Sequence, residues 1–226
     1  MSRTALIFGG APVVLTERLT KRLAQLDAPF VVAADAGADT AVRLGFLPHV
    51  VLGDFDSLEP ASLNRLQQRG VPIESYPRDK DATDGQLAIE RALAISPDDL
   101  LLVGFLGGPR LDQELANVLL LPRLPAATTL VDGSNECRLL RAGERWTWAA
   151  EPDEVVSLLP LWADAQGVYT DGLRWGLNGD TLRAGSTRGV SNEPIAERVR
   201  VGLTAGALLV TRHFPNPEPP TPDPLL

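Results

Sequence analysis

The sequence predicts an α/β protein in which an N-terminal parallel α/β sheet domain is followed by a smaller all-β sandwich domain. Over the first part of the chain, short apolar runs alternate with amphipathic segments of helical length. This alternation is the pattern of a parallel sheet with crossover helices. After about residue 133 the apolar runs are short, alternate with polar positions and are separated by turn residues. That second pattern is typical of an antiparallel sandwich or barrel.

Short apolar runs bounded by turn residues are expected to form the strands of the first domain. They cover residues 4–10, 30–37, 49–55, 71–77, 99–108 and 127–134. Between them, apolar residues recur at helical spacing, which predicts helices. These helices cover residues 12–26, 40–46, 57–70, 83–95 and 111–124. Thr83 is suited to cap the fourth helix and Gly70 to end the third.

The second domain is expected to contain strands alone, because no segment of helical length carries an amphipathic pattern there. The candidate strand segments are 137–149, 154–162, 166–177, 180–192 and 197–213. We place the α/β domain at residues 1–132 and the β-sandwich domain at residues 133–213. Residues 214–226 are proline-rich and are expected to be a disordered tail.

Composition and charge limit the class of protein. The 226 residues are 44% hydrophobic and 22% charged, which is ordinary for a globular chain. The net charge of −8 disfavours nucleic acid as a partner, because phosphate backbones are bound by basic patches. The apolar runs are too short to span a membrane, and the N-terminal run is too short for a signal peptide. Cys137 is the only cysteine, so no internal disulfide can form. We therefore expect a cytoplasmic protein with no nucleic-acid or membrane partner.

Three acidic stretches follow predicted strands and are expected to meet at one edge of the sheet, where open α/β sheets bind their ligands. They are ADAGAD (Asp35, Asp39), GDFDS (Asp54, Asp56) and RDKDATD (Asp79, Asp81, Asp84). Residues two apart on an extended backbone point to the same side, so Asp54 and Asp56 can share a face. Two such carboxylates need either a raised pKa or a hard divalent cation. With His49 and His213 as the only histidines, the composition suits Mg²⁺ and disfavours zinc.

Several features are open to both a functional and a structural interpretation. A single aspartate after a strand is often a helix cap or a turn residue, and this applies most to Asp39 and Asp79. The glycine-rich loop LGGPR, residues 106–110, suits phosphate oxygens at a helix N-terminus, but a plain turn is also plausible. Trp175 lies in GLRWGLNG, where a flat aromatic ligand could stack on it.

Four stretches together resemble the thiamine pyrophosphokinase family of the bacterial type. In chain order they are ADAGADTAVRLGFLPHVVLGDFDS, KDATDGQLAIERAL, GFLGGPRLDQELANVLLL and GSTRGVSNE, and they span about residues 33–193. They are similar to the family's Asp-Gly-rich loop with GDFDS, its Asp-x-Thr-Asp helix start, its GG-R-x-D-H-x-LAN block and its C-terminal Gly-x-Ser-Asn turn. GDFDS alone would be modest evidence, but four matches in the family's order are specific.

The resemblance implies a Rossmann-like sheet domain that binds ATP and Mg²⁺ and catalyses transfer, followed by a sandwich domain that binds thiamine. It implies that ATP and thiamine give thiamine diphosphate and AMP, with the thiamine hydroxyl attacking the β-phosphorus. Such a transfer depends mainly on positioning and charge neutralisation. Family members are homodimers with sites formed between subunits, so the resemblance also implies a homodimer.

The resemblance also assigns roles to individual residues. The implied catalytic residues are Asp54, Asp56, Asp84 and Arg110. The implied Mg²⁺ ligands are Asp35, Asp54, Asp56 and Asp84. The implied ATP-binding residues are Asp81, Thr83, Gly107, Gly108, Arg110, Asp112 and Asn117. The implied thiamine-binding residues are Trp175, Ser191 and Asn192. Which aspartate accepts the hydroxyl proton is left open.

Two glutamines depart from the family pattern. Gln86 stands where the family usually has Glu, and Gln113 stands where it usually has His, so neither is assigned an acid–base role. This loss of charge favours one alternative, a module that binds nucleotide or metal without turnover. A pyrophosphokinase for a related alcohol, such as a pterin, is a second alternative.

A third alternative is a phosphohydrolase of the haloacid dehalogenase type, with DFDS supplying an aspartate nucleophile. That motif normally ends the first strand of its domain, whereas two βα units precede GDFDS here. A suitable downstream lysine is also not evident from the sequence. Both points disfavour this alternative.

Overall fold

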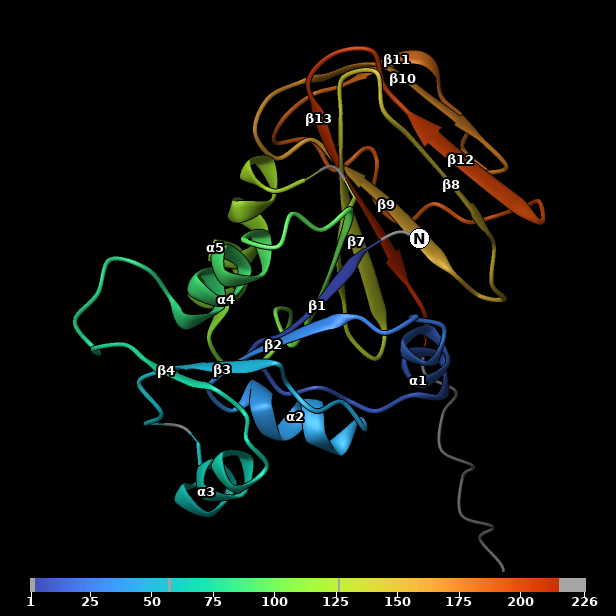
Figure 1. Ribbon diagram of the computed structural model, residues 1–226. Helices are drawn as coiled ribbons and strands as arrows, with labels where there is room; N and C mark the ends of the chain where they lie inside the picture. The colour runs from blue at the N-terminus through green and yellow to red at the C-terminus, as the bar shows by residue number, and fades with distance from the viewer. Residues whose placement is uncertain (1–2, 57, 126, 216–226) are drawn as a thin grey trace, which may run out of the picture. The chain divides into compact units, whose positions relative to one another are not determined.

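A computed structural model describes residues 3–56, 58–125 and 127–215 of the chain (Figure 1). The chain divides into two compact units, Met1–Leu139 and Leu140–Leu226. The first is an α/β unit and the second contains strands, in the predicted order. The finer boundary between residues 132 and 133 stays a prediction. Of the predicted tail, residues 216–226 lie outside the described residues, as does Ser57 at the end of GDFDS.

The first unit is built on a parallel sheet with the strand order β4-β3-β2-β1-β5-β6. The strands are β1 (Thr4–Phe8), β2 (Phe30–Ala34), β3 (Val50–Gly53), β4 (Ile73–Ser75), β5 (Asp99–Val103) and β6 (Thr128–Val131), and β7 (Asn135–Arg141) is antiparallel to β6. At the centre of the sheet, Ile7 lies opposite both Val32 and Leu102. The central strands are covered on both faces, and this explains why their sequences are continuous apolar runs.

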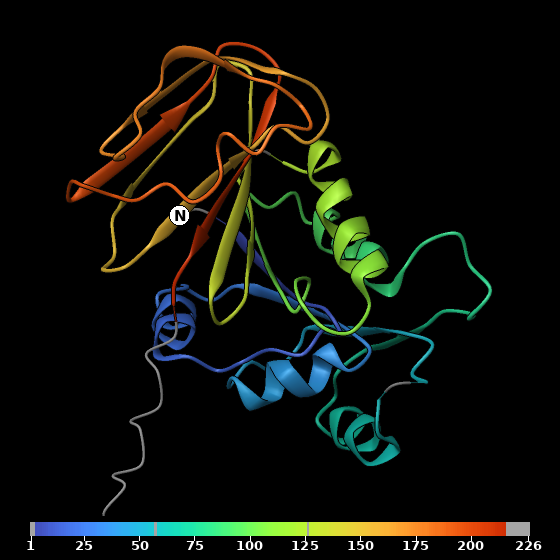
Figure 2. The ribbon, with the colours of Figure 1, turned by 180° about the vertical axis from the view of Figure 1, so that it is seen from behind.

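Helices cover both faces of this sheet (Figures 1 and 2). On one face lie α1 (Glu17–Ala24), α2 (Gly37–Arg43) and α3 (Pro60–Gln68); on the other lie α4 (Asp84–Leu93), α5 (Leu111–Leu120) and the short 3₁₀ helix η1 (Leu121–Arg123). Leu19, Ala41 and Leu66 of the first three helices are buried in one core with Phe8 and Val51 of the sheet. Within the described residues, no helix combines the length and apolar character needed to span a membrane.

Local chemistry sets several helix boundaries. The hydroxyl of Thr16 accepts a hydrogen bond from the Leu19 N–H at 3.2 Å, so α1 begins at Glu17 rather than at residue 12 as the sequence predicts. The hydroxyl of Thr83 accepts from the Gln86 N–H at 3.1 Å, which makes Thr83 the predicted cap of α4. The predicted helix 111–124 is divided into α5 and η1 at Pro122, whose missing N–H cannot continue the α-helical pattern.

The second unit is an antiparallel sandwich with a core of its own. One sheet has the order β11-β10-β12-β8, and β9 pairs with β13. The strands are β8 (Arg145–Ala149), β9 (Val155–Leu159), β10 (Ala165–Asp171), β11 (Asn178–Leu182), β12 (Arg198–Gly202) and β13 (Ala207–His213). Trp148, Leu158, Val168, Val201 and Val210 come from both sets of strands and share one buried core.

The segment after β11 contains less strand than the sequence predicts. Residues 180–192 read as a strand, but β11 ends at Leu182. The backbone at Gly185 (φ +78°) and Ser191 (φ +60°) is left-handed, which interrupts an extended chain. Asn192 then forms an isolated bridge with Val156. The segment is therefore a loop whose last residues, 189–192, return to the sandwich and bond to β9.

Candidate active site

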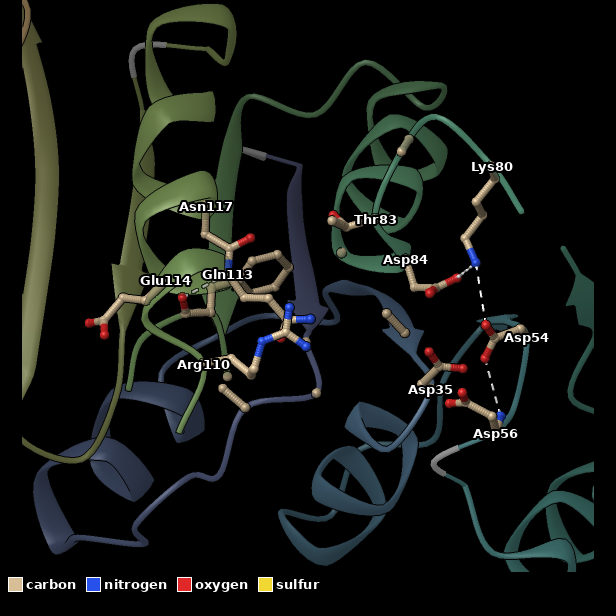
Figure 3. A pocket seen from close by; sticks show the side chains of 18 of the residues that line it. Asp35, Asp54, Asp56, Lys80, Thr83, Asp84, Arg110, Gln113, Glu114 and Asn117 are labelled. Atoms are coloured by element: carbon tan, nitrogen blue, oxygen red, sulfur yellow. Dashed lines mark hydrogen bonds and ion pairs between the residues drawn. The ribbon is translucent and has the colours of Figure 1, made fainter. Parts of the chain in front are cut away.

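A pocket of about 640 Å³ opens beyond the carboxyl ends of parallel strands in the first unit (Figure 3). Glycines come from the turns after β1 and β5, charged residues from the loops after β2, β3 and β4, and polar residues from α5. The lining residues are Gly9, Gly10, Ala11, Ala34, Asp35, Asp54, Asp56, Arg78, Lys80, Asp81, Ala82, Thr83, Asp84, Gly85, Gly104, Phe105, Gly107, Arg110, Gln113, Glu114 and Asn117. This is the usual position of a ligand site in an open parallel sheet.

Two glycines allow the turns after β1 and β5 to approach each other beside the pocket. A Cβ atom on Gly9 would lie 2.5 Å from the carbonyl oxygen of Gly104, and a Cβ atom on Gly104 would lie 2.5 Å from the carbonyl oxygen of Gly9. Gly104 also has a left-handed φ of +75°. Larger residues would therefore separate the two turns that line this side of the pocket.

Three carboxylates from separate elements meet on one side of the pocket. Asp35 follows β2, Asp54 follows β3, and Asp84 is the first residue of α4. One carboxylate oxygen of each lies within 4.8 Å of the others. Figure 3 shows the three side chains facing one another, with Asp56 beside them. The prediction that distant acidic stretches converge at one sheet edge is therefore correct for these three residues.

The Asp35 carboxylate is held by local backbone geometry. Asp35 has a left-handed φ of +45°, and its Oδ1 accepts a hydrogen bond from the Phe55 N–H at 3.0 Å. A Cβ atom on Gly53 would lie only 2.0 Å from the same oxygen. The glycine of GDFDS therefore leaves the space that the carboxylate of Asp35 occupies.

Residues 53–56 form a turn, which corrects the expectation of an extended backbone at Asp54 and Asp56. Phe55 between them has a left-handed φ of +60°. The Asp54 Oδ1 accepts a hydrogen bond from the Asp56 N–H at 3.2 Å, an arrangement typical of a turn stabilised by aspartate. Asp56 is exposed and lines the pocket, but it is not in the cluster of Asp35, Asp54 and Asp84. Its assignment as a fourth metal ligand stays a prediction.

Lys80 is the cation that pairs with this cluster. Its Nζ lies 3.0 Å from Asp84 Oδ1 and 3.7 Å from Asp54 Oδ2, and its side chain is mostly buried. Sequence reasoning did not assign Lys80, and it found no suitable lysine downstream of GDFDS; the structure corrects that point. The available signal was its place in RDKDATD, where Lys80 lies between Asp79 and Asp81 and four residues before Asp84.

Burial and neighbouring charges shift the pKa values of Asp35, Asp54 and Lys80. Burial, and then the charges of Asp84 and Asp54, raise the pKa of Asp35 to about 6, although the bond from Phe55 acts in the opposite direction. The hydrogen bond from the Asp56 backbone, followed by the charge of Lys80, lowers the pKa of Asp54. Burial alone would lower the pKa of Lys80, but Asp84, Asp54 and Asp35 outweigh it and raise that pKa.

The donor set fits a hard divalent cation. Three carboxylates against one lysine leave an excess of negative charge in a partly buried site, and oxygen ligands are those that Mg²⁺ prefers. The Asp84 Oδ1 atom is buried and accepts no hydrogen bond of good geometry within the described residues. This oxygen already lies 3.0 Å from the ammonium group of Lys80, which shows that its position suits a positively charged neighbour.

The opposite side of the pocket is formed by the glycine loop and α5. The Asn117 amide donates to the carbonyl oxygen of Phe105 at 2.9 Å, which ties α5 to the turn after β5. The Arg110 guanidinium donates to both oxygens of Asp112, at 2.8 and 2.5 Å, and this exposed pair lowers the pKa of Asp112 to about 2. Arg110 lines the pocket, whereas Asp112 does not.

Most of the residues predicted to bind ATP or metal lie together in this pocket. Those that line it are Asp35, Asp54, Asp56, Asp81, Thr83, Asp84, Gly107, Arg110 and Asn117. Gly108 and Asp112 are outside the lining. Besides Lys80, sequence reasoning missed Arg78 and Glu114, for which the sequence offers only their positions next to assigned residues. Of the two departing glutamines, Gln113 lines the pocket. Gln86 instead donates to Glu90 at 2.9 Å.

The residues predicted to bind thiamine lie in the second unit. Trp175 is 56% exposed. The buried side chain of Asn192 accepts from the Trp175 N–H at 3.1 Å and donates to the Trp175 carbonyl oxygen at 2.8 Å, so it fixes the backbone that carries the indole. The Ser191 N–H donates to the hydroxyl of Ser157 at 3.1 Å. Direct contacts of these residues with thiamine stay predictions.

The first unit has a parallel sheet and one pocket that is lined by a carboxylate cluster, a glycine loop and basic side chains. This combination defines a class of protein. It is typical of proteins that bind phosphate esters together with a divalent cation.

Comparison with known proteins narrows this class to a family. Residues 22–130 match the family model described as "Thiamin pyrophosphokinase, catalytic domain", and residues 149–208 match "Thiamin pyrophosphokinase, vitamin B1 binding domain". The chain is 29% identical over 184 residues to the thiamine pyrophosphokinase of Bacillus subtilis (strain 168), covering 80% of this chain and 86% of that protein. It is 28% identical over 226 residues to thiamine pyrophosphokinase 2 of Oryza sativa, covering 88% and 84%.

Solved structures agree with the sequence matches. The crystal structure of the Bacillus subtilis thiamine pyrophosphokinase superposes with a TM-score of 0.84 at 25% identity, covering 95% of this chain and 100% of that chain. That of the Geobacillus thermodenitrificans enzyme superposes with a TM-score of 0.80 at 27% identity, covering 94% and 98%. The chain belongs to the thiamine pyrophosphokinase family. This confirms the resemblance and removes the haloacid dehalogenase alternative.

Proposed function

We propose that this chain transfers the diphosphoryl group of ATP to the hydroxyl of thiamine, giving thiamine diphosphate and AMP. One observation carries the proposal: the models of both the catalytic and the vitamin B1 binding domain match, in order, along this one chain. The pocket in the region of the first match has the charges that such a transfer needs.

In the proposed reaction the thiamine hydroxyl oxygen forms a bond to the β-phosphorus of ATP. The bond from that phosphorus to the oxygen bridging to the α-phosphate breaks, and this oxygen leaves with AMP. The proton of the hydroxyl passes to a base, which we assign to one of the pocket carboxylates without choosing among them. The protein's own contribution is the positioning of the reacting groups and the compensation of charge.

We assign Asp35, Asp54 and Asp84 as the residues that would hold Mg²⁺, with Asp56 as the predicted fourth ligand. When bound, the cation would neutralise phosphate charge. Lys80 supports this assignment because it compensates part of the negative charge of the cluster before a cation arrives. The N–H groups around Gly107 and the Arg110 guanidinium, which line the same pocket, would bind phosphate oxygens.

We assign thiamine recognition to the second unit, with Trp175 stacking on the aminopyrimidine and Ser191 and Asn192 bonding to it. The exposure of the indole and its fixed backbone support a stacking role. A homodimeric state and a cytoplasmic location belong to the same proposal. Asp81, Thr83 and Asn117, which line the pocket, are assigned to the nucleotide, as are Gly108 and Asp112 beside it.

The deciding experiment mixes purified protein with ATP, Mg²⁺ and thiamine and follows AMP and thiamine diphosphate, with a control lacking thiamine. The proposal expects AMP and thiamine diphosphate to appear in equal amounts and only when thiamine is present. Nucleotide binding without product would instead support the non-catalytic module, for which the neutral Gln113 in the pocket is the favouring observation.

Trp175→Ala tests the thiamine assignment separately. It is expected to raise the KM for thiamine about fivefold or more, since stacking of an aromatic group contributes on the order of 1 kcal/mol or more, while the KM for ATP changes little. An equal change for both substrates would contradict the stacking role.

A further inference from the structure

A second cavity lies in the first unit, between α2 and α3. It has a volume of about 330 Å³ and is lined by Asp39, Val42, Arg43, Ser62, Arg65, Leu66 and Arg69. It shares no lining residue with the pocket described above. Its volume lies at the lower end of the ~300–1,000 Å³ of small-molecule sites. Neither the family matches nor the proposed reaction gives it a role.

The cavity is strongly basic in an acidic protein. Three of its seven lining residues are arginines, whereas the chain as a whole carries a net charge of −8. Asp39 is its one carboxylate, so the lining carries a formal charge of +2. Like charges gathered around one cavity repel each other, and a bound anion would relieve this repulsion.

The three guanidinium groups are not used in ion pairs within the described residues. Arg65 donates to the hydroxyl of Ser62 at 2.9 Å, and Arg43 makes a long contact with the Val13 carbonyl oxygen at 3.4 Å. Other arginines of the chain do pair with carboxylates, as Arg18 does with Glu136 and Arg91 with Glu74. The arginines of the second cavity therefore keep donors free for a ligand.

We infer that this cavity binds a small phosphate-bearing molecule. A phosphate monoester carries close to two negative charges at neutral pH and three acceptor oxygens, which match the +2 lining and the forked donors of the three arginines. Val42 and Leu66 provide an apolar wall for the rest of such a ligand. Nucleic acid is a poorer candidate, because the overall negative charge repels a long polyanion.

The test is a calorimetric titration of the full chain with inorganic phosphate in EDTA, where the carboxylate cluster of the first pocket disfavours anions. We expect saturable binding of one phosphate per chain. The combined variant Arg43→Gln, Arg65→Gln and Arg69→Gln is expected to weaken binding at least tenfold, as loss of charge-assisted hydrogen bonds does. Arg69→Gln alone guards against misfolding, because the Arg69 side chain is exposed and forms no hydrogen bond within the described residues; it is expected to weaken phosphate binding severalfold.

A matched control removes the same charge elsewhere: Arg183→Gln, Arg198→Gln and Arg200→Gln alter three exposed arginines of the second unit. This control and Arg110→Gln should both bind phosphate as the unmodified chain does. Three results would overturn the inference: no saturable binding to the unmodified chain, an equal loss in the second-unit control, or loss in Arg110→Gln. Succinate, a dicarboxylate, should show no saturable binding in the same titration. Succinate binding as tight as phosphate binding would overturn the inference that the ligand carries a phosphate.

Discussion

Two clusters of charged side chains, one in each unit, differ in how far their charge is balanced. In the second unit, Arg212 and Glu154 are almost fully buried and are joined by bonds of 2.6 and 3.1 Å. The Trp148 indole N–H and the Glu151 backbone N–H also donate to the Glu154 carboxylate. Each carboxylate oxygen thus has two donors, as a purely structural ion pair requires.

The cluster of the first unit is left unbalanced. The ammonium group of Lys80 pairs with Asp84 and Asp54, and burial together with the charges of these two carboxylates raises the pKa of Asp35. Local strain accompanies it, since Asp35 and Phe55 are both left-handed. An ion pair whose charges are balanced, such as Arg212 with Glu154, stabilises the fold. A cluster with excess negative charge, such as Asp35, Asp54 and Asp84, can bind a cation that balances it.

The largest effect is expected from breaking the balanced ion pair. Glu154→Gln removes the nearest counter-charge of the buried Arg212 guanidinium and leaves the Glu151 carboxylate at 3.8 Å, so it should lower the free energy of unfolding of the second unit by about 3 kcal/mol. Urea titration followed by tryptophan fluorescence measures this directly, because Trp148 belongs to the network. Arg188→Gln, which breaks an exposed pair with Asp180, is the control and should cost less than about 1 kcal/mol. A similar small loss for Glu154→Gln would contradict the distinction.

Removing a carboxylate from the unbalanced cluster should affect turnover rather than folding. Asp84→Asn is expected to lower kcat/KM for the thiamine reaction at least about 100-fold, or about 2.7 kcal/mol of activation free energy, because it removes a proposed cation ligand. Asp56→Asn is expected to lower kcat/KM as well, because Asp56 is the proposed fourth ligand. In EDTA, the Tm of the Asp84→Asn variant should equal that of the unmodified chain or lie slightly above it. Asp27→Asn, at an exposed position of the same unit, should leave turnover intact. Near-normal turnover of Asp84→Asn would remove the cluster from the mechanism.

Removing Lys80 should sharpen the dependence on a cation. Lys80→Met deletes the ammonium group that lies near Asp84 and Asp54, so the metal-free protein should lose about 1–2 kcal/mol of stability. Mg²⁺ should restore more stability to this variant than to the unmodified chain. The measurement is the difference in Tm between EDTA and Mg²⁺ for both proteins. Equal differences would mean that Lys80 does not offset the cluster.

The smallest effect is a pH-dependent gain. Burial raises the pKa of Asp35 to about 6, so its ionised form disfavours folding above pH 6 and this penalty vanishes as the pH falls toward 4. Asp35→Asn keeps an acceptor for the Phe55 N–H and tolerates the left-handed backbone. In EDTA it should raise stability at pH 7.5 by on the order of 1 kcal/mol, after allowance for partial exposure, and not at pH 4. A gain that is equal at both pH values would contradict the cause.

Much of the fold could be read directly from local pattern. The continuous apolar runs of β1, β2, β3 and β5 reflect burial on both faces, and the cap Thr83 is visible as a residue type. Two predictions of extended backbone were wrong, because the segment after β11 and residues 53–56 both turn through left-handed residues. The predicted start of the first helix at residue 12 was also wrong, since α1 begins at Glu17. Left-handed Phe55 and Ser191 carry no residue-type signal, because only glycine and asparagine or aspartate announce that conformation.

The sequence by itself determined the order of the elements, the acidic loops and the family, because these depend on residue types at fixed spacing along the chain. The tertiary structure decided that Asp35, Asp54 and Asp84 share one cluster, that Lys80 pairs with it, and that Gly53 makes room for Asp35. It also decided that Arg43 of α2, Arg65 of α3 and Arg69 just after α3 line one cavity. The physical reason is range: propensity and periodicity act between near neighbours, whereas electrostatic and steric contacts join residues that only the folded sheet brings together.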